Sequence, residues 1–593
     1  MHPRRLLILP GYLALVIGIT WPLAGSLGAA LPGYPNVDAT DTVMLRGLVA
    51  EALRGGPTIY HPVGLDPLNL TPNLADHLLG APLAWWLPFP LGDALWWLLA
   101  LTAVGVAGHH LGRQLGGSHG AGALVGVALL TSEAVAREAN LHHAPQVLAA
   151  VFAPLYLAAL LRAVGVSTRE SPRPRDAVMA GVWMSAAALS YWYQGLFLAT
   201  ASLPIALAAR RRWRPAARAV GGAAAVTAAI CAGPLLWTLG RWSAMPDAGA
   251  TAAPPGSADG VPAAWRVAFE HGVDPLLALS FTPADRSNGL ALALVVAVAA
   301  AAWVQRRDDR PAPWPLLWVA AIGAAFLLGP YLKRGEAALT GGGGLITLPF
   351  EWLGGLHPAL ARLTWPERWG LLVPLGLAAF AARAPRPWLF AVALLLEPLG
   401  RSQNLPLQQT DLTHERPWAA LAAADGAVLE LPLSRGWRTG SLPGRHLRWH
   451  GRSVVNPVLL PPGVRAPAAW QSWAAASPLV SAALAYEAGE SPPPPGPEAA
   501  AALRADGVGV VTLDLLTAGV TPARARAYER FLTASLGAPE DRGAMLVWWL
   551  TEVEVEAAPM DDPERWRAVT RQRWADAPEP ALETLIQPLW PAP

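Results

Sequence analysis

The chain has 593 residues, of which 53% are hydrophobic and only 15% are charged, whereas soluble domains usually carry about a quarter charged residues. The formal net charge is +2, so no overall basic field favours nucleic acid, and we expect no nucleic-acid partner. Cys231 is the single cysteine, which excludes an intrachain disulfide and a cysteine-based zinc site.

Long apolar blocks indicate one large membrane unit embedded in the lipid bilayer, because a helix needs roughly 20 mostly apolar residues to cross. Two arginines and an apolar run at the N-terminus also fit a cleaved signal peptide, but repeated returns to the membrane favour an uncleaved first helix. We predict about eleven spans. In chain order they are 6–26, 92–112, 119–137, 145–163, 177–193, 194–209, 217–240, 288–304, 313–331, 367–383 and 387–400.

The arginines predict the orientation, because cytoplasmic loops carry an excess of Lys and Arg. All the main clusters, of which 210–218 is the densest, fall on one side if 177–209 is a tight hairpin with Tyr191 to Gln194 at its outer tip. This puts the N-terminus in the cytoplasm and the C-terminus outside. The Ala, Gly, Pro, Arg and Trp bias indicates a high-GC bacterial genome, so we expect a multi-pass protein of the bacterial cytoplasmic (inner) membrane.

A long first outer loop, residues 27–91, contains Asp38 and Asp41 just before an amphipathic stretch at 42–54. Leucines and other apolar residues of this stretch share one face, with Arg46 elsewhere, which is typical of a helix in the membrane interface.

The two aspartates have two interpretations. Such carboxylates can supply a general base and a ligand for a divalent cation, Mg²⁺ or Mn²⁺, with Asp41 as the candidate ligand. Alternatively, Asp41 or Thr40 caps a helix that starts near Thr42, and Asp38 makes an Asx-turn.

A second group of polar residues, Glu138, His142, His143 and Gln146, lies near the outer end of the fourth span. Ionisable residues at that depth are costly and often functional, so they are candidates to bind a metal, a phosphate or an acceptor. The two histidines are adjacent and cannot both point the same way from a helix, so at most one is a ligand. The alternative is that these side chains are simply solvated among the lipid headgroups.

A third group stands where a later span begins on the outer side, with Arg362, Glu367 and Arg368. An arginine there can grip a phosphate with two parallel hydrogen bonds. The alternative is that the arginines reach to lipid phosphates, as long basic side chains commonly do at helix ends.

The chain changes character after about residue 405, where strand-like and helical stretches alternate. We predict strands at AVLELPL (427–433), RSVVNPV (452–458), GVGVVTLDLL (507–516) and AMLVWWLTEVEVE (544–556), with helices at 498–506 and 522–536. The predicted fold is therefore a polytopic α-helical transmembrane domain, residues 1–404, followed by a soluble, extracytoplasmic α/β domain, residues 405–593.

The order of these elements resembles the GT-C superfamily of membrane glycosyltransferases, in particular bacterial members that use a polyprenyl-phosphate sugar. The resemblance covers most of the chain. It rests on the acidic pair before an interfacial helix, on IYHPVGLDPLNLTPNLADHLLGAPL (59–83), on EANLHHAPQ (138–146), on LSYWYQGLF (189–197) and on LTWPERWG (363–370). Trp-Pro-Glu-Arg stands where the family has Arg-Pro-x-Arg, so one expected basic residue is missing.

The resemblance implies transfer of a hexosyl or pentosyl group from a polyprenyl-phosphate donor to a glycan, lipid or protein acceptor during synthesis of the cell envelope. It implies Asp38 as the catalytic base and Asp41 as a second catalytic or metal-binding residue. It also implies the second group, with Arg362 and Arg368 of the third, as substrate-binding residues. The other functions that the sequence allows are a non-catalytic membrane protein and a transporter of lipid or polysaccharide. No inverted repeat is visible and the spans hold few ionisable residues, which disfavours a transporter.

Overall fold

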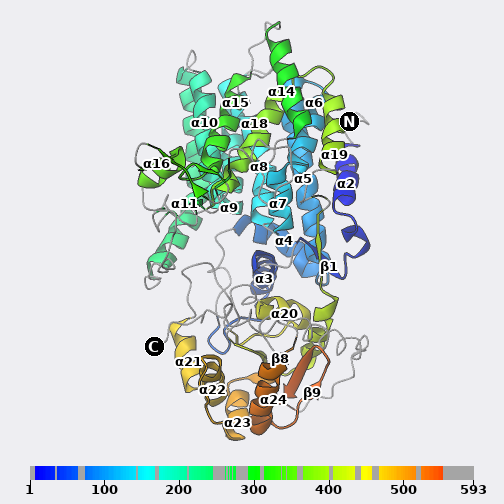
Figure 1. The fold of residues 1–593 in the computed structure, drawn as a ribbon, viewed down its shortest axis with the longest axis vertical. Helices are drawn as coiled ribbons and strands as arrows, with labels where there is room; N and C mark the ends of the chain where they lie inside the picture. Colours follow the sequence, from blue (N-terminus) through cyan, green and yellow to red (C-terminus); the bar gives the residue numbers. More distant parts are fainter. Residues whose placement is uncertain are drawn as a thin grey trace.

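The protein is described here from a computed structural model, in which a helical part is followed along the long axis by a mixed α/β part (Figure 1). The structure describes residues 7–33, 37–64, 74–141, 144–166, 173–209, 213–244, 261, 265, 268–269, 272–274, 291–307, 313–334, 337–341, 344–356, 365–399, 405, 407–433, 442–456, 467–515 and 522–551. The side chains of 37–41 lie outside this part.

A helix coincides with each predicted span. The helices are α2 (Ile8–Ile19), α5 (Leu91–Gly116), α6 (His119–Leu130) with α7 (Glu133–Asn140), α8 (Ala144–Val164), α9 (Pro174–Ser190), α10 (Trp192–Ala208), α11 (Trp213–Ala244), α14 (Leu292–Gln305), α15 (Trp314–Leu327), α18 (Leu372–Ala381) and α19 (Pro387–Leu399). Short elements between them are α16 (Pro349–Leu356), the 3₁₀-helix η5 (Pro366–Leu371) and two small hairpins, β2–β3 (Lys333–Arg334, Ala337–Ala338) and β4–β5 (Thr340–Gly341, Gly344–Leu345).

Three helices of the described residues are long and apolar enough to cross a bilayer, namely Leu91–Gly116, Pro145–Val164 and Trp213–Leu236. A fourth crossing results if α6 and α7, which meet at a 45° bend, are counted as one broken span. These helices indicate a membrane protein. The remaining apolar helices are shorter, so the total of about eleven crossings stays a prediction.

The membrane helices pack closely through small residues, as is usual where lipid offers no hydrophobic driving force. At Gly108 of α5, an added Cβ would lie 2.9 Å from the Cα of Gly126 in α6. The stretch 177–209 is broken at Tyr191, where an extended backbone separates α9 from α10. The break lies where the hairpin was predicted, and the two helices contact one another.

Helix α3 (Val37–Ala52) begins five residues before the predicted start near Thr42, so Asp41 does not cap a helix there. Both predicted catalytic aspartates therefore lie in its first two turns, where the backbone N–H groups favour negative charge. Arg46, which the sequence placed away from the apolar face of this stretch, has a completely buried side chain because it pairs with carboxylates. Figure 1 shows α3 between the helical part and α20 (Leu442–His450).

The C-terminal part contains a four-stranded sheet of order β7-β8-β10-β9. Strand β7 (Ala427–Leu431) runs parallel to β8 (Val508–Asp514), which pairs antiparallel with β10 (Met545–Trp549), and β9 is Glu540–Asp541. Three predicted strands are thus present, whereas 452–458 contributes only a single bridge from Val454 to Val428 within its described residues.

Helices cover this sheet. They are α21 (Ala468–Ala476), α22 (Pro478–Glu487), α23 (Glu498–Ala505) and α24 (Pro522–Leu536), and the last two match the predicted helices. A 3₁₀-helix, η6 (Thr413–Ala423), precedes the sheet. A short antiparallel ladder joins the segment before α3 to the segment before η6, since β1 (Ala30–Pro32) pairs with β6 (Gln409–Asp411). The domain boundary at 404/405 stays a prediction.

Candidate functional site

A small cavity that opens to solvent lies where the ends of several helices meet. Four residues that the sequence singled out, Glu138, Gln146, Glu367 and Arg368, line it together. The other lining residues are Ala134, Val135, Val147, Ala150, Tyr191, Gln194 and Leu371. We call this space the α7–α8 cavity.

Glu138 reaches the cavity because the span before it is broken. Helix α6 ends at Leu130, and the Ser132 hydroxyl caps the next helix by accepting a hydrogen bond from the Val135 amide at 3.3 Å. The short helix α7 then carries Glu138 into the wall, where it is only 7% exposed and pairs with Arg137 at 2.7 Å. Glu138 is therefore a buried, paired carboxylate rather than a solvated headgroup residue.

Arg368 reaches the opposite wall from η5. In a 3₁₀-helix successive side chains point about 120° apart, so Arg368 and its neighbour Trp369 face different surroundings. Trp369 is fully buried, with its ring 4.1 Å from that of Phe197 and 4.4 Å from that of Phe326. Arg368 donates a hydrogen bond through Nη1 to the Tyr191 hydroxyl, and its guanidinium lies 4.8 Å from the Trp365 ring. Its contacts are therefore within the protein, although the side chain is half-buried.

Two amide side chains of the cavity have buried atoms without a hydrogen-bond partner among the described residues, Gln194 Nε2 and Gln146 Oε1. Gln194 is 3% exposed. A buried donor or acceptor left unpaired costs about 1–3 kcal/mol, and native structures usually avoid it. Both residues line the cavity, and a bound hydroxyl group could pair with either atom, since a hydroxyl both donates and accepts.

The charges around the cavity balance. Arg368 lines the cavity together with the carboxylates of Glu138 and Glu367. Arg137 does not line it but pairs with Glu138 at 2.7 Å, so these four side chains together carry no net charge. Neutral hydroxyl-rich groups suit such a wall, because carboxylates and amides hydrogen-bond them without leaving a net buried charge. Arg368 is the positively charged side chain that lines the cavity, and its guanidinium has five N–H donors with which to bind an anionic group.

The other predicted site residues lie partly outside the described structure. Asp38 and Asp41 are placed by their backbone alone, and His142, His143 and Arg362 are outside the described residues. The chain just before α3 does reach α7: a Cβ added to Gly33 would lie 2.6 Å from the Asn140 carbonyl oxygen. Five residues span at most about 18 Å, so Asp38 lies within that distance of Gly33.

The described side chains include no group of three or more His, Cys, Asp or Glu residues placed to hold a metal ion. The one candidate ligand that the sequence offered, Asp41, has a side chain outside the described part. Binding of Mg²⁺ or Mn²⁺ therefore stays a prediction, and no chemical step below depends on it.

Tyr191 and Gln194 were not among the predicted site residues, although both stand in the predicted hairpin tip. A glutamine inside the apolar run from Trp192 to Ala208 is the signal that could have identified them, because an amide in such a run needs a polar partner.

Comparison with known proteins adds little to this geometry. No model of a protein family matches the chain, and no curated protein sequence matches it. Among solved structures it is similar to a cryo-EM structure of the arabinofuranosyltransferase AftD from Mycobacteria, with 16% identity and a TM-score of 0.48. The match covers 87% of this chain but only 37% of that one, so the chain corresponds to little more than a third of that protein.

Proposed function

We propose that this protein is a membrane glycosyltransferase that moves a sugar from a polyprenyl-phosphate carrier to an acceptor. The observation that carries the proposal is the α7–α8 cavity, in which Gln146 and Gln194 present unpartnered amide atoms beside Glu138, Glu367 and Arg368. The sugar of the donor would occupy this wall, with its hydroxyl groups bonded to the amides and carboxylates. Glycan, lipid and protein acceptors all offer the hydroxyl that the reaction needs.

Arg368 would stabilise the departing phosphate. Negative charge develops on the phosphate as the bond from the anomeric carbon to its oxygen breaks, and a preorganised cation there accelerates the step. Arginine suits this task because its planar donors match phosphate oxygens. Tyr191 would keep the guanidinium aimed into the cavity through the hydrogen bond that it accepts.

Asp38 would be the general base. It would take the proton of the acceptor hydroxyl as that oxygen attacks the anomeric carbon, a role that contributes typically about 10²–10⁴-fold to a rate. Its place in the first turn of α3, five residues after Gly33, supports this assignment. Asp41, one turn later, would orient the acceptor or bind a divalent cation.

The proposed orientation has the cavity at the outer face of a bacterial cytoplasmic membrane, with the C-terminal α/β part beyond it. The side of the helical part that bears α7 also meets β6, since the Asn140 side chain accepts a hydrogen bond from the Gln408 amide at 2.8 Å. A periplasmic reporter fused after Thr551 and a cytoplasmic reporter fused after Ala209 test this orientation. Reversed signals would contradict it.

The activity is tested with the purified protein in lipid vesicles, incubated with a panel of polyprenyl-phosphate sugars and hydroxyl-bearing acceptors. We expect covalent transfer from at least one donor. Movement of the donor across the vesicle bilayer without any glycosidic product would favour a transporter instead.

A further inference from the structure

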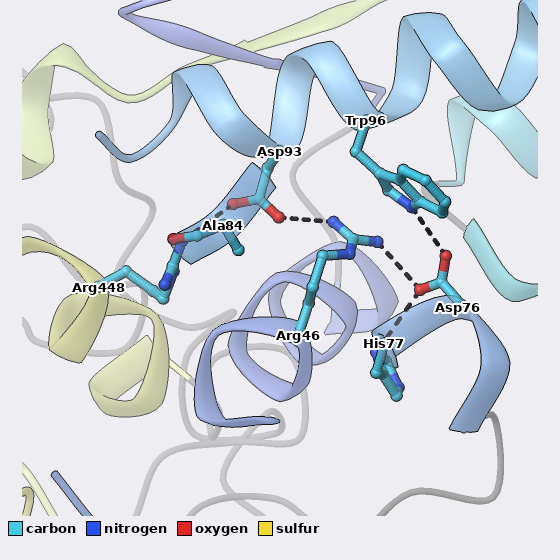
Figure 2. Close-up of polar contacts among 7 residues, drawn as sticks. All are labelled: Arg46, Asp76, His77, Ala84, Asp93, Trp96 and Arg448. Carbon is cyan, nitrogen blue, oxygen red and sulfur yellow. Dashed lines mark hydrogen bonds and ion pairs between the residues drawn. The ribbon is translucent and has the colours of Figure 1, made fainter. Parts of the chain in front are cut away.

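Four charged side chains meet in the protein interior where α3, α4 (Leu74–Trp86), α5 and α20 converge (Figure 2). Arg46 of α3 bonds through Nη1 to Asp93 at 2.5 Å and through Nη2 to Asp76 at 3.0 Å. Arg448 of α20 bonds through Nη2 to the second oxygen of Asp93 at 3.4 Å. We call these four residues the buried joint.

The joint is closed to solvent. The side chains of Arg46, Asp76 and Asp93 have no exposed surface, and that of Arg448 is 5% exposed. Two arginines against two aspartates leave no net charge. The Trp96 indole N–H donates to the remaining oxygen of Asp76 at 2.9 Å, so both carboxylates bond through both of their oxygens.

Two glycines make room for the arginine side chains. A Cβ at Gly47 of α3 would lie 2.0 Å from Cδ of Arg448, and a Cβ at Gly80 of α4 would lie 2.5 Å from Cδ of Arg46. Glycine inside a helix is otherwise unfavourable. Both glycines therefore leave room for the aliphatic part of an arginine side chain, although glycine weakens the helix that contains it.

The pairing of Arg46 with Asp76 stabilises the charged form of both side chains. Burial alone would raise the pKa of Asp76, but the attraction of the Arg46 guanidinium and the smaller contributions that add to it, among them the Trp96 hydrogen bond, together outweigh burial, so the pKa lies below its ordinary value. Burial, with Arg46 adding to it and Asp76 opposing it, lowers the pKa of the neighbouring His77 to about 4. His77 is thus neutral at physiological pH and adds no charge to the joint.

We propose that Arg46 and Arg448 are positioning residues that hold helix α3, and with it Asp38, against the end of the membrane helices. This inference rests on the proposed function, in which Asp38 is the base. Arg46 stands eight residues after Asp38 on the same helix, about 12 Å along its axis at 1.5 Å per residue. A helix fixed at Arg46 therefore sets where its first turn points.

The C-terminal part acquires a specific role in this way. It supplies Arg448, which closes the joint over α3, and Trp449, whose ring packs edge-on against Phe89 with 5.0 Å between centroids. Buried ion pairs are often no better for stability than apolar residues of the same size. Here the ion pairs form only when α3, α5 and α20 are in one relative arrangement, so they specify that arrangement.

The test is a double-mutant cycle between Gly47 and Arg448 in the full-length protein. Gly47→Ala should raise helix propensity, yet its methyl group displaces Arg448. We expect faster amide hydrogen exchange in 37–52 and a kcat lower by on the order of 10²-fold, since small misplacements of a catalytic group have such effects. KM should change little, because the cavity is untouched.

Arg448→Ala removes the clash, so Gly47→Ala should add little in that background. Gly221→Ala in α11, where an added Cβ meets nothing within 4 Å, is the matched control and should change neither readout. Chromatography on the purified variants checks that they remain folded.

Two results would overturn the inference. One is that Gly47→Ala behaves like Gly221→Ala, or has equal effects with and without Arg448. The other is faster exchange in 37–52 with an unchanged kcat, which would make the joint purely structural. If the parent protein transfers no sugar at all, the proposed function fails and the positioning role with it, while the exchange cycle still reports whether the joint clamps α3.

Discussion

Arg448 donates a hydrogen bond to Asp93 across 355 positions of the sequence, with 3.4 Å between Nη2 and Oδ2. The same carboxylate accepts from Arg46 through its other oxygen. Asp93 of α5 thus accepts hydrogen bonds both from α3 and from α20 of the C-terminal part.

Asp93→Asn should lower the free energy of unfolding by about 3–5 kcal/mol, because removing one member of a buried ion cluster leaves uncompensated charge. Thermal unfolding of the purified protein measures it. The matched control is Glu540→Gln, which breaks the Arg542–Glu540 pair at 2.8 Å, where the Glu540 side chain is 42% exposed. Exposed pairs contribute roughly 1 kcal/mol or less. An equal decrease in the free energy of unfolding of both variants would show that the buried Asp93 contributes no more to stability than an exposed carboxylate.

Asp38→Asn should reduce sugar transfer by about 10²–10⁴-fold while leaving thermal unfolding nearly unchanged, since it removes a general base and keeps the shape. Asp41→Asn separates the roles of the two residues. Loss in both variants, with a further dependence on EDTA, would assign a metal to Asp41; loss in both without that dependence would assign acceptor binding. Full activity of Asp38→Asn would remove Asp38 from the mechanism.

The sequence predicted the positions of the apolar helices and of three C-terminal strands, because long apolar runs and alternating patterns are local signals. It predicted the start of α3 poorly, since Val37 to Asp41 reads equally well as a turn before the helix and as its first turns. The burial of Arg46 could not be predicted from the sequence, because it depends on the ion pairs with Asp76 and Asp93, which form only in the folded protein.

The residues of the candidate site were likewise predicted only in part. Glu138, Gln146 and Arg368 were identified one by one from their depth in the predicted spans, and the structure brings them to one cavity. That Tyr191 and Gln194 join them depends on how α9 and α10 pack against α8, a tertiary contact that periodicity does not encode.

Gln194→Leu should raise KM for the donor about tenfold or more and should also stabilise the substrate-free protein slightly, because it removes a buried unpaired amide. Gln305→Leu is the control: its Nε2 is likewise buried without a partner, but it lies outside the cavity. It should keep the KM. No gain in thermal stability is expected from it, because the substitution also removes the hydrogen bond that Gln305 Oε1 accepts from Arg383 Nη1 at 3.5 Å. A raised KM in both variants, or in neither, would contradict the role of Gln194.

Stability should fall in mild acid because buried histidines are held neutral. Burial, with His446 and Arg452 adding to it, lowers the pKa of His450 to about 3, from an ordinary 6.5. The unfolded chain binds this proton below pH 6.5 and the folded one does not, so stability is lost as pH falls from 6.5 toward 3. The slope is about 1.4 kcal/mol per pH unit for one histidine.

His450→Gln should remove that share of the slope, as measured by unfolding at several pH values between 4 and 7. A slope identical to that of the parent protein would show that His450 takes up a proton in the folded state.

The central claim, that the α7–α8 cavity binds the phosphate-linked sugar and promotes its transfer, is tested most directly by the transfer rate of Arg368→Gln. We expect the parent protein to form a glycosidic product from a polyprenyl-phosphate sugar and Arg368→Gln to lose about 10²-fold or more, as removal of a preorganised donor typically does. Arg334→Gln, which changes an exposed arginine outside the cavity, should keep the full rate. A parent protein without product, or an Arg368→Gln variant as fast as Arg334→Gln, would contradict the claim.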